Sequence, residues 1–232
     1  MAGRQGIEDA ALLEAWSRGD LAAGTALFER HYLSIARFFH NKVNEAAYQD
    51  LIHETFLACQ KSAARFRGQA SFRSYLFGIA HNVLAGHLRQ LTRHRQRLAP
   101  DMDLEELPAV SFGLLPIAAM EQREEQRLLL EALRRIPLHH QLALELHYWE
   151  ALTAAEVGEV LGIPLGTAKT RLRKGRVYLE AQLRKLAHSP ETLQSTLDNL
   201  EGWAQRIRAQ IVPKPGAGGV VPDLDGDAAR GR

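Results

Sequence analysis

The sequence contains few residues of the kinds that mark secreted, fibrous or membrane proteins. Its single cysteine, Cys59, cannot form an internal disulfide and leaves no cysteine set for a zinc site. Glycine (18) and proline (9) are too sparse for a collagen-like repeat. No apolar run approaches the roughly 20 residues that span a bilayer, and Met1 to Asp20 lacks the apolar segment of a secretory signal. We therefore expect a cytoplasmic protein with no membrane insertion.

An excess of one charge is also absent, but the charges are unevenly distributed. The 232 residues, 46% hydrophobic and 24% charged, suit one or two globular domains with a net charge of +2. Residues 86–97 hold four arginines and no acid, and residues 165–185 hold seven lysines and arginines with one acid. Residues 101–106 hold four acids and no base. This pattern indicates contact with a polyanion at two places, with two solvated helix faces as the alternative.

Apolar residues recur at three- and four-residue spacing through most of the chain. The pattern is clearest in Leu27–Phe39, Leu51–Cys59 and Phe72–Leu88. This spacing is typical of amphipathic helices, and no sustained two-residue alternation or hairpin signal interrupts it. The sequence therefore predicts an all-α fold, with Cys59 buried on an apolar helix face rather than reactive.

The helical pattern breaks between residues 98 and 119, where three prolines occur. Such a composition predicts a flexible linker rather than a packed element. We expect four parts: a helical domain over 1–98, an acidic, proline-containing linker over 99–119, a second helical domain over 120–188, and a C-terminal extension over 189–232. Within the extension, an amphipathic helix is expected first and a disordered tail after it.

The second domain contains the pattern of a helix-turn-helix. Thr153 and Glu156 have capping-box spacing, Gly162 suits the end of the short helix, and a longer basic helix follows. In this motif the second helix enters the major groove of DNA. Its early polar side chains suit base edges and phosphates: Thr167, Lys169, Thr170, Arg171, Arg173 and Lys174. A helical hairpin with a charged face is the alternative.

A short loop in the first domain places an aromatic residue between two arginines. Phe66, Arg67 and Gly68 are followed by Phe72 and Tyr75. Aromatic side chains stack on unpaired bases with about 1–3 kcal/mol each, which suggests a second nucleic-acid site. The alternative is that Phe66 and Phe72 are core residues, and residue physics alone favours it.

Several motifs in order resemble those of a known family. The quoted segments are Asp50-Leu51-Ile52-His53-Glu54-Thr55-Phe56, Phe66-Arg67-Gly68, Phe72-Arg73-Ser74-Tyr75-Leu76, Ile79-Ala80-His81-Asn82 and Gly162-Ile163-Pro164-Leu165-Gly166-Thr167-Ala168-Lys169-Thr170-Arg171-Leu172. Together they resemble bacterial extracytoplasmic-function (ECF) RNA polymerase sigma factors, over about residues 8–98 and 121–186. The resemblance implies a non-enzymatic factor that needs no cofactor or metal and directs promoter-specific transcription initiation.

The resemblance also implies partners and contact residues. Core RNA polymerase would be bound through its β′ clamp helices and its β flap, the former by Asp50, Leu51, His53, Glu54 and Phe56. The melted minus-ten element of promoter DNA would be held by Phe66, Arg67, Gly68, Phe72, Tyr75, Asn82, Arg89 and Arg93. The minus-thirty-five element would be bound by the six helix-turn-helix side chains named above.

Some features leave alternatives open. His53 stands where the family usually has Gln, and Gly175 where Ala is common. The C-terminal extension is expected either to pack on the second domain or to regulate it, and an anti-sigma protein is a third option. A stand-alone helix-turn-helix regulator is an alternative function, although no ligand or phosphoacceptor domain is evident. Another is an interaction protein that sequesters partners with a degenerate sigma fold.

Overall fold

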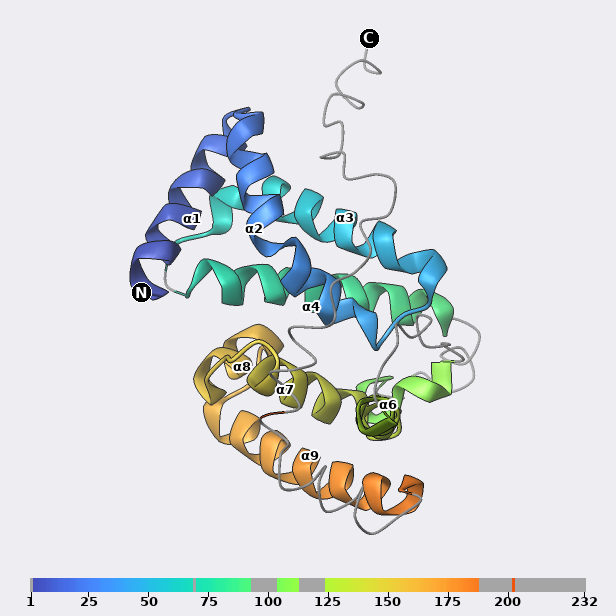
Figure 1. The fold of residues 1–232 in the computed structure, drawn as a ribbon. Helices are drawn as coiled ribbons and strands as arrows, with labels where there is room; N and C mark the ends of the chain where they lie inside the picture. The colour runs from blue at the N-terminus through green and yellow to red at the C-terminus, as the bar shows by residue number, and fades with distance from the viewer. Residues whose placement is uncertain (1, 69, 93–103, 113–123, 188–201, 203–232) are drawn as a thin grey trace.

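The computed structural model describes residues 2–68, 70–92, 104–112, 124–187 and Gly202. Within these ranges the chain forms α-helices and short 3-10 helices without a strand, which confirms the all-α prediction (Figure 1). The elements are α1 (Ala2–Ser17), α2 (Leu21–His40), α3 (Glu45–Lys61), η1 (Ala63–Arg65), α4 (Phe72–Leu91), η2 (Leu104–Glu106), η3 (Ala109–Phe112), α6 (Glu124–Arg134), α7 (Leu138–Tyr148), α8 (Ala154–Leu161) and α9 (Leu165–Leu186). No helix among these is long and apolar enough to cross a membrane. The expected C-terminal helix lies outside the described residues.

Side-chain caps fix where the helices of the N-terminal half begin. The Asp20 carboxylate accepts hydrogen bonds from the amides of Ala22 and Ala23, at 2.9 and 3.1 Å, and starts α2. Ser71 starts α4 in the same way, because its hydroxyl accepts the Ser74 amide at 3.0 Å. Both caps satisfy amides that the first helical turn leaves unpaired.

The helix-turn-helix pattern is confirmed by its backbone. Thr153 and Glu156 form the capping box at the start of α8, and Gly162 ends the helix in the left-handed conformation at φ +64°. Gly158 allows the turn to close, since a Cβ there would lie 2.9 Å from the Ile163 carbonyl oxygen. Ala168, on α9, is fully buried where the two helices meet. Small residues therefore set the angle between α8 and α9.

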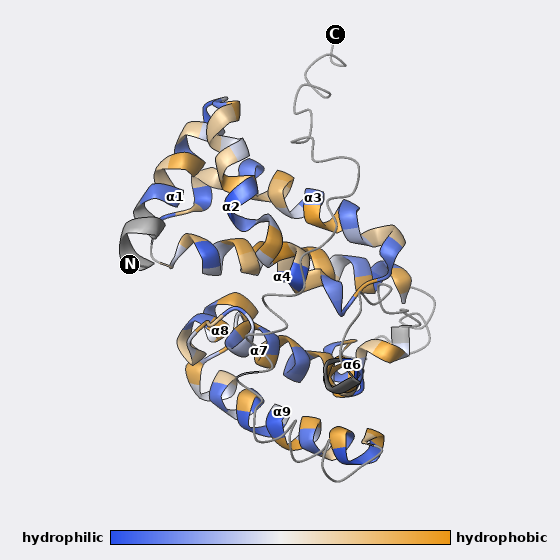
Figure 2. Cartoon of the chain, viewed as in Figure 1, coloured by the Kyte–Doolittle hydropathy of each residue, from blue (hydrophilic) through white to orange (hydrophobic). Residues whose placement is uncertain are grey.

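Helices α1 to α4 form one layer of the molecule, and α6 to α9 form the other (Figure 1). Apolar and hydrophilic bands alternate along the helices, as amphipathic packing requires (Figure 2). The buried aromatic residues of the first layer include Trp16, Phe39, Phe56, Phe72 and Phe77. The second layer has its own apolar cluster between α6, α7 and α9, built around Leu129, Leu133, Ile136, Leu179 and Leu183.

The two layers share a core, although the sequence predicts them as separate helical domains. Helix α4 packs against α8, and a Cβ at Gly78 would lie only 3.9 Å from the Val160 carbonyl oxygen. Leu142, Leu146 and Val157, from α7 and α8, are buried in the same apolar cluster as the first layer. The contact between the halves is therefore a packed interface.

The described part of the linker, residues 104–112, is packed rather than free. Leu104 and Ala109 are buried at 8% and 1% exposure. The Leu107 carbonyl accepts a hydrogen bond from the Leu138 amide at 3.0 Å, which ties the linker to the start of α7. The prolines predict a linker between the two halves, and within it apolar side chains anchor the described residues to the core.

Candidate nucleic-acid interface

The loop between η1 and α4 borders a cleft of about 350 Å³. Gly68 adopts a left-handed conformation at φ +68°, which a residue with a Cβ rarely adopts, and so turns the chain at the tip of the loop. Arg67 is exposed beside it, and Phe66 is half-buried at the cleft wall. The loop thus brings a cation and an aromatic edge to one concave surface.

The three predicted aromatic residues cluster, but they differ in exposure. The ring of Phe66 lies 5.0 Å from that of Tyr75 and 5.9 Å from that of Phe72. Tyr75 is half-buried, and its hydroxyl donates to the Ser62 carbonyl at 2.8 Å. Phe72 is only 2% exposed and packs against His31, so its ring supports the loop from the core and is not available to stack on a base. For Phe72, the alternative interpretation of a core residue is therefore the right one.

Asn82 connects this cleft with a larger one of about 800 Å³ between α3 and α4. Asn82 and Arg89 are exposed on α4, and Arg89 also donates to the Ala85 carbonyl of its own helix at 3.1 Å. Arg65 lines both clefts and was not among the predicted residues. Arg65 directly precedes Phe66 and Arg67 in the sequence, and this position is the signal by which it could have been predicted as a site residue. Arg93 lies outside the described residues.

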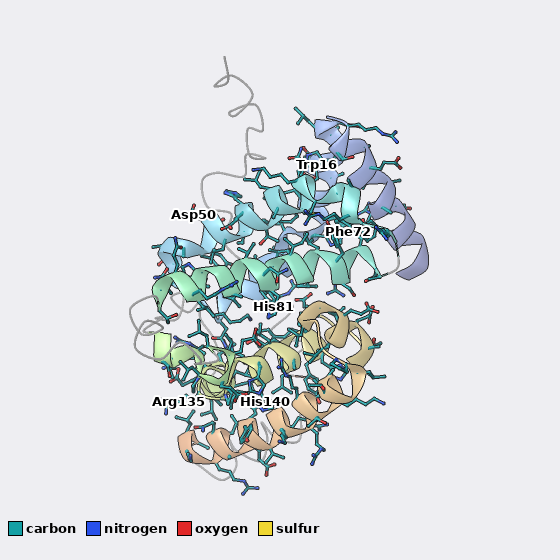
Figure 3. All side chains as sticks on the ribbon, turned by 180° about the vertical axis from the view of Figure 1, so that it is seen from behind. Trp16, Asp50, Phe72, His81, Arg135 and His140 are labelled. Carbon is teal, nitrogen blue, oxygen red and sulfur yellow. The ribbon has the colours of Figure 1, made fainter. Side chains whose placement is uncertain are left out.

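The predicted polymerase-binding residues separate into surface and core. Asp50 and Glu54 are exposed on α3, with Asp50 labelled in Figure 3, and His53 is half-exposed between them. Leu51 and Phe56 are 5% and 1% exposed, because α3 uses that face to pack in the first layer. A surface of two acids and a histidine remains for a partner.

The second basic surface is the start of α9. Thr167, Lys169, Thr170, Arg173 and Lys174 are exposed there. Their neighbour Arg171 is half-buried, and its guanidinium lies 3.6 Å from the Glu105 carboxylate. Exposed cations and hydroxyls at the start of a helix match the chemistry of phosphates and base edges.

Gly175 has a packing role that the sequence did not reveal. A Cβ at this position would lie 3.2 Å from Leu144 and 3.3 Å from His140, both on α7. The glycine therefore lets α9 approach α7 closely. On the same side, His140 Nδ1 donates to the Arg171 carbonyl at 2.9 Å, and burial lowers the pKa of His140. These contacts hold α9 so that its basic face points outward.

The single cysteine lies in the core, away from these surfaces. Cys59 is fully buried, as predicted, and burial raises the pKa of its thiol to about 12. No group of three or more histidine, cysteine, aspartate or glutamate side chains within the described ranges is arranged to hold a metal ion.

Two family models match the chain, one in each half. The model described as Sigma-70 region 2 matches residues 27–94, and that described as Sigma-70, region 4 matches residues 126–179. The first contains the loop and the residues of α3 and α4 that line both clefts, and the second contains the helix-turn-helix. The two matches therefore cover the two surfaces described above.

Two curated proteins with similar sequences are both named ECF RNA polymerase sigma factors. The chain is 30% identical over 148 residues to the ECF RNA polymerase sigma factor SigW of Bacillus subtilis, covering 62% of this chain and 78% of that protein. It is 24% identical over 188 residues to the ECF RNA polymerase sigma-E factor of Haemophilus influenzae, covering 78% and 97%.

Solved structures share the fold. CnrH in complex with the cytosolic domain of CnrY superposes with a TM-score of 0.56 at 19% identity, covering 78% of this chain and 99% of that one. The sigma factor RpoE of Bartonella quintana, in complex with the anti-sigma factor NepR, superposes with a TM-score of 0.52 at 17% identity, covering 68% and 96%.

Proposed function

The chain belongs to the ECF RNA polymerase sigma factors, and we propose that it binds core polymerase and directs it to a promoter with two DNA-binding surfaces. The observation that carries this proposal is the presence of both surfaces, the loop cleft and the start of α9, each within a matched sigma region. As sigma factors do, it works by binding and not by catalysis, in the cytoplasm where the polymerase acts. A stand-alone regulator would need only the second surface.

The parts of the chain divide this work. Residues 1–98 bind the polymerase clamp and the minus-ten element, 99–119 link the halves, 120–188 bind the minus-thirty-five element and the β flap, and 189–232 form an extension. On α3, the exposed Asp50 and Glu54 and the half-exposed His53 meet the clamp helices. Leu51 and Phe56 hold that helix in place from the core.

The loop cleft captures an unpaired base of the minus-ten element. Phe66 and Tyr75 offer ring faces and edges at its wall, Asn82 offers an amide, and Arg67 offers a charge for the adjoining phosphate. Extruding a base costs a few kcal/mol, which stacking and hydrogen bonds in such a cleft can offset. Arg89, farther along α4, meets the neighbouring backbone.

The recognition surface on α9 reads duplex DNA. Thr167, Lys169, Thr170, Arg171, Arg173 and Lys174 are placed to meet the minus-thirty-five element in the major groove. Arginine can bond guanine with two hydrogen bonds, and threonine offers both a hydroxyl and a methyl group. Partners of this chain are thus core polymerase and promoter DNA, and an anti-sigma protein is proposed from the relative bound to NepR.

The variant Asn82→Ala tests the division of work between the two surfaces. With core polymerase, we expect the variant to melt the minus-ten element at least tenfold less, as measured by permanganate reactivity of thymines. Its binding to a fully paired minus-thirty-five duplex should stay unchanged, which serves as the internal control. Equal melting by the variant and the parent would contradict the assignment of the loop cleft.

A further inference from the structure

Two buried ionisable side chains, Asp9 of α1 and His31 of α2, form a pair that the proposed function does not use. His31 Nε2 lies 2.9 Å from the Asp9 carboxylate, and Arg30 pairs with the same carboxylate. Asp9 and His31 are 3% and 5% exposed. A charged group is costly to bury unless it is paired and hydrogen-bonded, so the pair is a specific feature of this core.

The Asp9 carboxylate fixes the orientation of the imidazole ring. Burial by itself would raise the pKa of Asp9, but the hydrogen bonds and charges of His31 and Arg30 outweigh it and lower the pKa. The carboxylate is therefore ionised near neutral pH and can only accept a hydrogen bond, so His31 Nε2 is the donor. This hydrogen bond, together with close packing, restricts the ring to one orientation.

Helix α1, which carries Asp9, is held on α2 by a second contact. Trp16 lies two turns after Asp9 on the same face of α1, and its indole packs directly over Gly24 of α2, where a Cβ would clash with it. Helix α1 also packs against η1 and α4, the two elements that flank the loop (Figure 1). The Asp9 carboxylate is thus a fixed point behind the loop.

A chain of aromatic contacts leads from His31 to the loop cleft. The centre of the His31 ring lies 5.2 Å from that of Phe72, the first residue of α4. Phe72 in turn meets Phe66 edge to face, with 86° between the two ring planes, and Phe66 lines the cleft. An edge-to-face contact depends on how the two rings are oriented. The orientation of Phe66 therefore depends on that of His31, two contacts away.

We propose that Asp9 and His31 are positioning residues for base capture, because they hold the ring of Phe72 and, through it, the ring of Phe66 at the wall of the loop cleft. The inference rests on the proposed function, since it concerns the same cleft. Neither residue of the pair lines the cleft. Their effect is that the stacking surface is ordered before the base arrives, so binding does not bear the entropic cost of ordering it.

Removal of the captured base from a DNA probe measures the stacking directly. The probe is a fluorescent single strand with the minus-ten element of a promoter from which the chain directs transcription, and one base at a time is removed to leave an abasic site. Fluorescence anisotropy follows its binding to the complex of core polymerase with the full chain. At one position, we expect the parent to bind the intact strand about tenfold more tightly than the abasic strand.

Two variants remove the two parts of the proposed device. Asp9→Asn replaces the charged acceptor by a neutral amide, which orients His31 more weakly. His31→Gln keeps a donor for Asp9 but removes the ring that faces Phe72. We expect each to reduce the preference for the intact strand to about threefold or less, with affinity for the abasic strand within about twofold of the parent.

The matched control is Glu8→Gln, which makes the same change from carboxylate to amide next to Asp9. Glu8 is exposed and lies 3.7 Å from Arg30. Because its carboxylate is on the surface, its removal should leave the preference for the intact strand at the parent's value.

The ratio of the two affinities distinguishes positioning from a purely structural role. A variant that only unfolds part of the protein lowers both affinities by the same factor and leaves their ratio unchanged. Thermal unfolding, followed by circular dichroism, measures the loss of stability separately. A preference equal to the parent's in both variants, whatever their melting temperatures, would overturn the positioning role.

Failure of the proposed function gives a different result. In that case the chain would not bind core polymerase, or no abasic position would weaken binding by the parent itself. The positioning role would then fall together with the cleft that it serves.

Discussion

At the scale of single residues, His40 connects the stability of the fold to pH. Burial, and to a lesser degree the charge of Lys42, lowers the pKa of His40 from 6.5 to about 4. Its Nδ1 atom is buried, and no described residue hydrogen-bonds to it. As pH falls, the unfolded chain therefore takes up a proton at this residue before the folded protein does. The stability that the neutral ring contributes is complete above about pH 6.5 and is lost toward pH 4.

The variant His40→Gln measures this contribution. At about 1.4 kcal/mol per pH unit, His40 lowers the free energy of unfolding by about 2–3 kcal/mol between pH 7 and pH 4.5. We expect urea unfolding of the variant to show a pH dependence smaller by that amount. Burial also lowers the pKa values of His87 and His140, so some dependence in the same direction remains. Identical slopes for parent and variant would contradict the role of His40.

Gly158 is required by the turn between α8 and α9. In Gly158→Ala the new Cβ would meet the Ile163 carbonyl oxygen at 2.9 Å, a backbone atom that cannot move aside freely. We expect a net loss of about 1–2 kcal/mol in the free energy of unfolding, after the gain in helix propensity. Gly166→Ala is the control, because a Cβ there meets no described atom within 4 Å. This variant should not lower the free energy of unfolding. Equal effects of both would show that the close approach is relaxed in solution.

At the scale of elements, α9 combines two functions along its length. Its first turns carry the exposed cations proposed to meet DNA, and its later turns pack through Leu179 and Leu183. We expect Lys174→Ala to weaken binding of the minus-thirty-five duplex and to lower the slope of log K against log salt by about one. Lys185→Ala removes the same charge near the end of the helix and should leave the slope unchanged. A salt titration of DNA binding measures both, and equal slopes would refute the assignment of Lys174.

The ends of helices were predictable because the sequence signals that set them are local. The capping box at Thr153 and the helix end at Gly162 each act within a few residues, and both are confirmed. The exposure of single residues was harder to predict. Phe72 and Phe56 lie in family motifs but face the core, because a motif records spacing along the chain and not which helix face is covered.

At the scale of the whole molecule, the contact between the halves could not be predicted from the sequence. It depends on pairs such as Arg37 with Glu150, which are 113 residues apart and carry no signal of their pairing. The same holds for Glu105 and Arg171, since the acidic linker gives its charge but not its partner. Composition predicts segments that bind a polyanion, whereas only the packed structure shows that an acid of this chain, Glu105, lies against an arginine of one of them.

Transcription from genomic DNA tests the central claim most directly. Core RNA polymerase of the source organism is incubated with its sheared genomic DNA, with and without the full-length chain, and the 5′ ends of the transcripts are sequenced. A known sigma factor with the same core serves as the positive control. We predict start sites that occur only with the chain and share two upstream elements near minus ten and minus thirty-five. No new start sites, while the control sigma factor is active, would contradict the account.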